Sequence, residues 1–437
     1  MRTDIPEKLR AESGVQDAEK VLRSCVHCGF CNATCPTYLL SGNELEGPRG
    51  RIYLIKNALE GNIEVDAKAA AHIDHCLGCL ACETTCPSGV TYSRLLEEAR
   101  PRLEQRIRRP LAERFLRWTL VQTLPYPWRL RLALRLAPLG RALGFAVPSS
   151  LRPLLEMAPR RLPARATVAR PGVLPAQGER RLRVALLAGC AQEVLGPRIN
   201  DAAARLLTRL GCEVVLPPAS GCCGALTYHM GERERSLELM RHAIAVWQAE
   251  MEGEGLDAVV LTTSGCATAV KEYGHIFAEE PRWAAAAAAV AAKVRDISEV
   301  VAELGLGAAG KAPRLRVAYH DACSMQHGLR VKQQPRELLA AAGFEVAEVP
   351  EGHICCGSAG TYNMLYPETA GQLRRRKAGH IAGLQVQAVC AGNIGCIEQI
   401  AAGLGEGGAG LPVAHTVELL DWATGGPAPA GLEAADG

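Results

Sequence analysis

The chain contains 437 residues, of which 48% are hydrophobic and 22% charged, with a net charge of +3 at pH 7. This composition excludes global disorder and indicates two to four domains, each large enough to bury a hydrophobic core. No stretch approaches about eighteen strongly apolar residues, which excludes a membrane-spanning helix. The charge is uneven, because the segment from Arg100 to Arg183 has nineteen Arg, no Lys and four acidic residues, a local charge of +15.

The amino-terminal segment MRTDIPEKLRAESG has no apolar run and no cleavage site, so we expect no secretory signal. Eighteen cysteines in an extracellular protein would imply disulfides, whereas thiols in a reducing cytoplasm stay available to iron. We therefore expect a cytoplasmic protein. Any contact with a membrane should be peripheral, on the cytoplasmic face of the inner membrane.

Two copies of the cysteine pattern C-x2-C-x2-C-x3-C-P dominate residues 1–100, and they begin at Cys25 and at Cys76. Such runs bind [4Fe–4S] clusters, with three thiolates from one run and the fourth from the other run. The expected ligand sets are Cys25, Cys28, Cys31 and Cys86 for the first cluster, and Cys35, Cys76, Cys79 and Cys82 for the second. Structural zinc is the alternative, but it explains neither the third cysteine nor the Cys-Pro in both copies.

The stretch between the two runs predicts a helix. Its apolar positions Ile52, Ile55 and Leu59 fall at helical spacing, and Gly47-Pro48 provides a start signal. An insert of this length favours an α-helical ferredoxin-type 2x[4Fe–4S] domain, at residues 1–100, over the compact β-hairpin type. Arg49 and Arg51 could raise the reduction potentials of the clusters, but a solvated helix face is the simpler expectation.

Residues 101–180 form an Arg- and Pro-rich helical connector that holds eleven of the 26 prolines. Two amphipathic faces are expected: Leu111, Phe115, Trp118 and Val121 on the first, and Leu130, Leu134 and Ala137 on the second. Arg interleaved with Trp and Leu could contact anionic lipid, nucleic acid or a partner subunit, or pack on the protein's own domains. We favour packing on the chain itself or docking of a partner, and we do not expect nucleic acid.

The rest of the chain is an internal repeat. The segment RLRVALLAGC ending at Cys190 is matched by RLRVAYHDAC ending at Cys323, and a CCG triplet begins 32 positions later in both copies. Strand-like and helix-like runs alternate, which predicts a duplicated α/β domain with parallel strands. The expected boundaries are 181–305 for the first CCG repeat and 312–425 for the second, followed by a flexible tail at 426–437.

Cysteines at strand ends gather at the carboxyl edge of a parallel sheet, so each half should present four converging thiols. These are Cys190, Cys222, Cys223 and Cys266 in the first half, and Cys323, Cys355, Cys356 and Cys396 in the second. Adjacent cysteines followed by Gly suit a tight turn that brings two thiolates to one metal. We favour binding of a metal or of a further iron–sulfur centre over a redox-active dithiol or merely packed thiols.

Polar residues near the repeat cysteines differ between the halves. His320, Asp321 and His353 flank the second set and could move protons, whereas Leu187 and Ala188 replace the first two in the other half. We find no GxGxxG, P-loop, Ser/His/Asp or HExxH motif. We therefore expect no flavin or nicotinamide on this chain, and no catalytic residue.

Two ferredoxin-type runs followed by two CCG repeats resemble the iron–sulfur subunits of membrane-associated dehydrogenases related to heterodisulfide reductase. The stretch CVHCGFCNATCPTYLLSGNELEGPRGRIYLIKNALEG, from Cys25 to Gly61, is especially similar to the glycolate oxidase iron–sulfur subunit family. The resemblance implies FAD-containing partner subunits that oxidise glycolate to glyoxylate. It implies that this chain passes the electrons to a quinone or another acceptor through clusters bound by the eight cysteines of the two C-x2-C-x2-C-x3-C-P runs.

One departure from the wider CCG family concerns the end of each repeat, where that family has a C-x2-C pair. Here Thr263 and Asn393 take the place of the earlier cysteine, which favours electron transfer over disulfide chemistry. The alternatives are the same relay in a lactate or glycerol-3-phosphate dehydrogenase, a heterodisulfide-reductase-like thiol/disulfide enzyme, and a basic module that binds nucleic acid.

Overall fold

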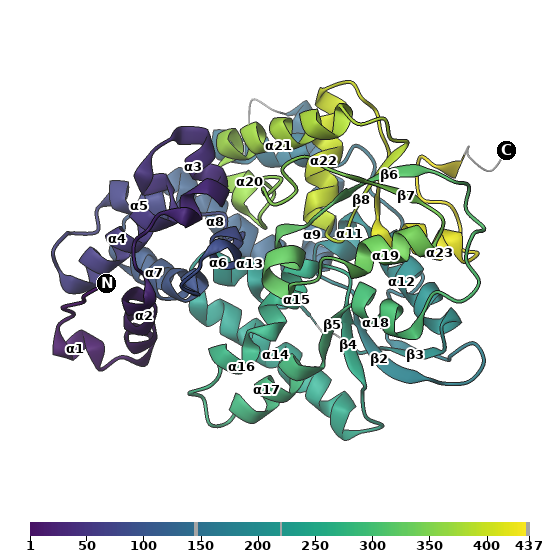
Figure 1. The fold of residues 1–437 in the computed structure, drawn as a ribbon, viewed down its shortest axis with the longest axis horizontal. Helices are drawn as coiled ribbons and strands as arrows, with labels where there is room; N and C mark the ends of the chain where they lie inside the picture. Colours follow the sequence, from purple (N-terminus) through teal and green to yellow (C-terminus); the bar gives the residue numbers. More distant parts are fainter. Residues whose placement is uncertain (144–146, 219–220, 434–437) are drawn as a thin grey trace.

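The computed structural model describes residues 1–143, 147–218 and 221–433. Its amino-terminal helices lie to one side of two α/β halves (Figure 1, purple against teal to yellow). Residues 434–437 of the expected flexible tail lie outside the described residues.

Residues 1–106 fold entirely into helices and turns, which confirms the α-helical ferredoxin type. The helices are α1 (Glu7–Arg10), α2 (Ser13–Ser24), η1 (Phe30–Thr34), α3 (Pro36–Ser41), η2 (Glu44–Glu46), α4 (Pro48–Glu60), α5 (Ala67–Asp74), α6 (Ala81–Thr85) and α7 (Tyr92–Arg106). The predicted insert is α4, which starts with Pro48 at its first turn and stops before Gly61 in a left-handed conformation. Its apolar face packs into one core with α2, α5 and α7.

The connector is helical and packs on the rest of the chain. It contains α8 (Leu111–Thr123), α9 (Pro127–Ala142), η4 (Ser149–Leu151) and α10 (Arg152–Met157). Leu116, Leu120 and Leu130 share a hydrophobic cluster with Val194 and Met230 of the first half. The apolar faces expected from the sequence therefore divide: Leu130 and Ala137 are buried as core residues, whereas Leu111, Phe115 and Trp118 are exposed.

An ion pair and a hydrogen bond also attach the connector to its two neighbours. Arg109 lies 2.8 Å from Asp74 of α5, and buried Arg117 donates to the carbonyl of Met230 at 3.4 Å. Part of the basic charge of this segment is thus used inside the molecule.

Each α/β half contains one sheet, with the order β1-β3-β2-β4-β5 in the first and β7-β6-β8-β9 in the second. The strands are β1 (Gly172–Leu174), β2 (Leu182–Leu187), β3 (Cys212–Leu216), β4 (Ala258–Leu261), β5 (Val294–Asp296), β6 (Arg316–His320), β7 (Glu345–Glu348), β8 (Ala388–Ala391) and β9 (Val413–His415). All pairs are parallel except β1 with β3, which confirms the predicted parallel α/β repeats. The edge strand β1 comes from the end of the connector and was not expected.

The remaining helices surround the two sheets. They are α11 (Gln192–Leu195), α12 (Pro197–Arg209), α13 (Ala225–His229), α14 (Arg233–Glu252), α15 (Ser264–Lys271), α16 (Tyr273–Ile276), α17 (Ala284–Lys293) and α18 (Ile297–Leu304) in the first half, and the π-helical segment η5 (Ser324–Leu329), α19 (Gln334–Ala341), α20 (Tyr362–Leu365), α21 (Pro367–Ala382), α22 (Ile394–Glu406) and α23 (Thr416–Ala423) in the second.

One continuous core joins the two halves. Helix α12 of the first half packs on α23 of the second, and α18 packs on α19. The alternation along β2 explains this arrangement, since Val184 and Leu186 face the shared core while Ala185 and Leu187 face a second core under α14 and α17. The two halves therefore form one body with a fixed relation between their strand ends.

The α12–α23 contact includes a buried charge. The carboxylate of Asp421 lies 2.6 Å from Arg205 and 3.1 Å from Arg209, and it is almost fully shielded from solvent. We expect Asp421→Asn to lower the free energy of unfolding by about 2 kcal/mol, between the cost of an exposed and of a fully buried pair. Calorimetry of the anaerobic protein measures this effect.

The control is Glu406→Gln, because Glu406 pairs with Arg374 at an exposed position within one half. A melting temperature equally unchanged in both variants would contradict the role of Asp421 in joining the halves.

Candidate metal centres

The first four expected cysteines line one pocket of about 430 Å³ in the amino-terminal domain. Cys25, Cys28 and Cys31 come from the loop after α2 and from η1, and Cys86 follows α6. Burial raises the pKa of the Cys31 thiol to about 11, and neighbouring Cys25 and Cys86 add to the shift. The second run thus contributes its Cys-Pro cysteine to the first pocket.

The other four cysteines line a second pocket of about 360 Å³. Cys35, which precedes α3, joins Cys76, Cys79 and Cys82 there. Burial raises the pKa values of Cys79 and Cys82 well above the usual thiol value, and their neighbouring thiols raise them further. Binding of metal by these two sets stays a prediction, and the side chains are gathered as such binding requires.

The backbone of the two cysteine runs repeats the same unusual conformation. His27 and Gly29 have φ of 60° and 88°, and the residues fifty-one positions later, Gly78 and Leu80, have φ of 64° and 63°. A left-handed conformation costs a non-glycine residue about 1–2 kcal/mol. Each run contains one non-glycine residue in this conformation, His27 in the first and Leu80 in the second. The resulting turns place three cysteines of each run around one pocket.

Arg51 was expected in solvent, and this expectation is wrong. Its side chain is 1% exposed and lies 2.8 Å from Glu46, 3.1 Å from the hydroxyl of Thr37 and 3.9 Å from the Cys35 sulfur. Helical periodicity could not separate it from Arg49, which pairs with Glu44 and stays partly exposed. The Arg51 guanidinium is therefore a buried positive charge beside the Cys35 sulfur.

Tyr92 is a residue that the sequence did not reveal. It lines both pockets, it is buried, and its hydroxyl has no hydrogen-bond partner among the described residues. Burial raises the pKa of the phenol well above its usual value, so the group remains a neutral donor. An unpaired buried donor between two thiolate pockets is well placed to bind sulfur.

The repeat cysteines of the first half also converge. Cys190 follows β2, Cys222 and Cys223 precede α13, and Cys266 lies in α15. Hydrogen bonds from Cys222 and Cys266 hold the pKa of Cys223 well below its usual range. The amide of Gly224 donates to the Cys222 sulfur at 3.4 Å.

The second half repeats this arrangement at the carboxyl edge of its own sheet. The sulfur atoms of Cys323 and Cys355 lie 3.8 Å apart, and Cys356 contacts Cys396 at the start of α22. At Gly357, which has a φ of 90°, a Cβ atom would lie only 2.7 Å from the carbonyl oxygen of Ala370. Any side chain at Gly357 would clash with that carbonyl, which explains the glycine after the cysteine pair.

The second pocket and the second half adjoin each other. Burial raises the pKa of the Cys79 thiol, and the nearby Cys323 thiol raises it further. Cys79 in turn contributes to the raised pKa of the Cys355 thiol. Next to them, Thr84 Oγ1 lies 2.7 Å from Nδ1 of His327 in η5. Thiols of the amino-terminal domain and of the second repeat therefore meet across the domain boundary.

The positions where the wider CCG family has an additional cysteine serve other purposes here. Asn393 caps α22 and donates to Ser264 across the two halves at 3.1 Å. Thr263 donates to Gln192 at 2.7 Å. Both side chains are thus engaged in hydrogen bonds within the protein.

The three polar residues that flank the cysteines of the second repeat lie in different surroundings. Asp321 is held by Arg336 at 2.6 Å, His353 is exposed, and only His320 faces the repeat cysteines. Cys212 and Cys390 are fully buried in strands β3 and β8, outside the four thiol groups.

Comparison with known proteins agrees with this architecture. The family described as 4Fe-4S dicluster domain matches residues 21–90, and the family described as Cysteine-rich domain matches residues 184–271 and 317–401. The chain is thus an iron–sulfur protein with a 4Fe-4S dicluster domain and a duplicated CCG domain. In the described residues no helix is long and apolar enough to cross a membrane.

Whole-length relatives define the family further. The chain is 40% identical over 424 residues to the glycolate oxidase iron-sulfur subunit of Escherichia coli (strain K12), covering 97% of this chain and 99% of the relative. It is 35% identical to the probable glycolate oxidase iron-sulfur subunit of Bacillus subtilis (strain 168), covering 93% and 95%. Lactate utilization protein A of Geobacillus kaustophilus (strain HTA426) is 30% identical over 55% of this chain and 99% of its own. The chain belongs to the family of glycolate oxidase iron–sulfur subunits.

Tyr92 offers a test of the paired pockets. Removing its hydroxyl in Tyr92→Phe leaves the volume nearly unchanged and deletes one hydrogen-bond donor to sulfur. Since such bonds raise the reduction potential of a cluster, we expect unchanged iron content and a lower midpoint potential for at least one cluster. A redox titration followed by EPR measures it.

Tyr53→Phe is the matched control, because Tyr53 is an exposed tyrosine of α4. Equal potentials in Tyr92→Phe and Tyr53→Phe would contradict a bond between the Tyr92 hydroxyl and a cluster.

Proposed function

We propose that this chain is the electron-transfer subunit of a multi-subunit glycolate dehydrogenase. In this proposal an FAD-containing partner oxidises glycolate to glyoxylate, and this chain carries the electrons toward a quinone or another acceptor. The observation that carries the proposal is the continuity of thiol groups, from the first pocket through the second pocket to the second repeat. Tyr92 borders both pockets and Cys79 lies beside Cys323.

The two pockets support the proposed ligand sets, and Cys82 lies at the border of both pockets. Cys25, Cys28, Cys31 and Cys86 would hold one [4Fe–4S] cluster, and Cys35, Cys76, Cys79 and Cys82 a second one. A bound [4Fe–4S] cluster supplies single-electron transfer. The chain's own residues hold the sulfur atoms around two pockets, and Arg51 places a positive charge beside Cys35.

The repeat cysteines supply two further groups of four thiols. We propose that Cys190, Cys222, Cys223 and Cys266 bind metal in the first half, and that Cys323, Cys355, Cys356 and Cys396 do so in the second. Thiol–disulfide chemistry is less well supported, because Thr263 and Asn393 stand in place of cysteines. Thr263 donates to Gln192 within the first half, and Asn393 caps α22 and donates to Ser264 across the halves.

Glycolate as the substrate rests on the names of the two whole-length relatives. Lactate is the second candidate, since lactate utilization protein A aligns over 242 residues at 30% identity. The flavin is expected on a partner, because the sequence contains no nucleotide-binding motif of its own.

A surface on α8 and α9 suggests where a peripheral membrane contact would form. Its apolar members are exposed and follow each helix at three- to four-residue steps: Leu111, Phe115 and Trp118 on α8, and Trp128, Leu132, Leu136 and Leu139 on α9. Exposed Arg114 and Arg135 add positive charge to the same helices. Such a combination binds the boundary of an anionic bilayer, where a quinone is accessible.

The membrane contact predicts a loss of vesicle binding on substitution. We expect Trp128→Ala combined with Leu132→Glu to weaken co-sedimentation with phosphatidylglycerol vesicles at least tenfold, and Val173→Ser, an exposed apolar residue of β1, to have no effect. Equal binding by both variants would contradict this surface as the contact.

The relay is tested on the complex purified anaerobically with its native partners. We expect iron, sulfide and the EPR signals of reduced clusters, and glycolate should reduce the clusters and a dye. Cys28→Ser should remove one cluster signal and electron transfer to the distal acceptor, while Cys390→Ala, a buried cysteine outside the thiol groups, should keep both.

If no flavoprotein co-purifies, and glycolate leaves the clusters oxidised even with candidate flavoproteins added, the proposed function is wrong. Reduction by lactate in place of glycolate would assign the relay to the second candidate.

A further inference from the structure

The imidazole of His320 is unusual among the buried groups of this chain. It lies at the end of β6, it is fully buried, and neither ring nitrogen has a hydrogen-bond partner among the described residues. Leaving a buried polar atom without a partner costs about 1–3 kcal/mol. Binding of a ligand to the imidazole would remove part of this cost.

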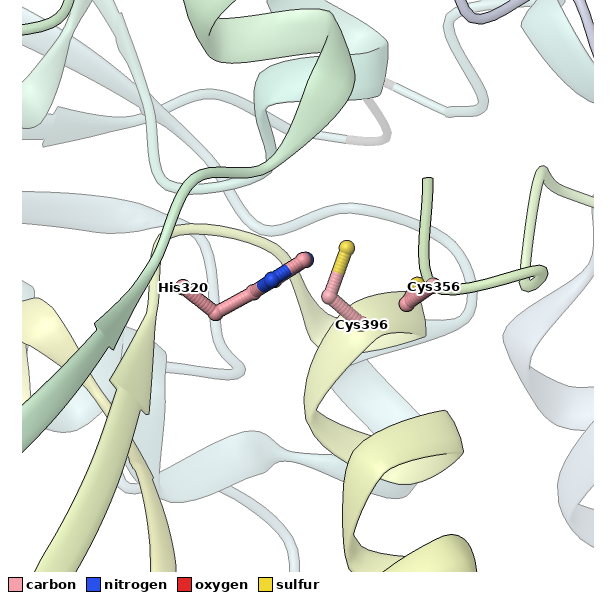
Figure 2. Close-up of side chains that lie close together, drawn as sticks. All are labelled: His320, Cys356 and Cys396. Atoms are coloured by element: carbon pink, nitrogen blue, oxygen red, sulfur yellow. The ribbon is translucent and has the colours of Figure 1, made fainter. Parts of the chain in front are cut away.

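The surroundings of His320 identify the kind of group. Its ligand atom and the sulfur atoms of Cys356 and Cys396 all lie within 4.8 Å of one another. The three side chains come from a strand end, a loop and the start of α22, and they point toward one another (Figure 2). Metal–sulfur bonds of about 2.3 Å and metal–nitrogen bonds of about 2.0 Å around one ion need this clustering.

We propose that His320 is a metal ligand and that, with Cys356 and Cys396, it binds a thiophilic metal centre of iron or zinc in the second half. Cys355 and Cys323 adjoin this group and supply the further thiolates. The inference rests on the proposed binding of metal by the repeat cysteines and adds a ligand of a different chemical type. Mixed sulfur and imidazole sets of this kind select zinc or iron.

The charge around the site agrees with an anionic metal centre. Lys377 of α21 is buried, and its Nζ donates to the carbonyl of Glu351 at 2.7 Å. Burial lowers the pKa of this ammonium group, and the nearby thiols of Cys356 and Cys355 oppose that shift. A buried cation of this kind offsets the negative charge of several thiolates.

The first half lacks both features. Leu187 takes the place of His320 in the matching strand. Leu373 of α21 packs on Gly357, and Met240 of α14 packs on Gly224 in the same way. The residue four positions after Leu373 is Lys377, and the residue four positions after Met240 is Ile244. At these matched positions the imidazole and the buried cation are therefore found in the second half and not in the first.

This asymmetry has a consequence for electron flow. Imidazole is neutral where thiolate is anionic, so a histidine ligand raises the potential of an iron centre. An iron centre in the second half would thus accept electrons more readily than an all-thiolate centre in the first half.

The experiment uses the full chain, purified anaerobically with its partners from cells supplied with ¹⁵N-histidine. For an iron centre, pulsed EPR should show a ¹⁵N coupling on a signal other than those of the two ferredoxin-type clusters. For a zinc centre, X-ray absorption at the zinc edge should show imidazole scattering together with sulfur. Either result supports the proposal and identifies the metal.

Variants make the assignment specific. We expect His320→Ala to lose the metal of the second half under dialysis against a chelator, and His320→Cys to keep the metal but lose the nitrogen signature. His353→Ala, an exposed histidine two residues before Cys355, should change neither. If His320→Ala does not fold, the wild-type spectra and His320→Cys decide the question.

Absence of a nitrogen signature at both metals in the wild-type chain, or unchanged metal content and spectra in His320→Ala, would overturn the proposal. These readouts are independent of the proposed function, which is measured by reduction of the ferredoxin-type clusters by glycolate. Failure of that reduction with an intact imidazole signature would contradict the relay alone.

Discussion

The structure depends on bringing buried thiols close together. Sixteen cysteines form four groups of four, and burial together with neighbouring thiols raises the pKa of members such as Cys79. Several thiolates in such surroundings repel one another unless a cation lies among them. Helix starts, left-handed turns and the glycines after both cysteine pairs all contribute to this convergence, so binding of metal by these groups would be coupled to folding.

The duplicated half fixes how these groups lie relative to one another. Its two sheets share one core through α12 with α23 and α18 with α19, and its strand ends carry the thiols. Contacts across the halves, such as Asn393 with Ser264, occupy positions that other members of the CCG family use for cysteine. The symmetry of the fold is therefore combined with unequal chemistry. His320 and Lys377 lie in the second half, and the apolar residues Leu187 and Ile244 take their places in the first.

Spacing predicted much of this, because cysteine patterns and repeats are local in sequence. The exchange of Cys35 and Cys86 between pockets and the parallel sheets could be read from the chain. Burial of single polar residues could not: Arg51 and Arg49 have the same helical signature, and only packing against Thr37 and Glu46 distinguishes them. Tyr92 and His320 have no motif, since their roles arise from unpaired atoms at contacts between distant segments, and β1 is too short to leave a pattern.

The most direct test of the account is EPR spin quantification of the fully reduced, anaerobically purified chain. Because Tyr92 and Cys82 border both pockets, two clusters held there lie close enough for their spins to interact. The account predicts two spins per chain from the amino-terminal domain, with signals broadened by mutual coupling. A single uncoupled spin, or zinc in place of iron in these pockets, would contradict it.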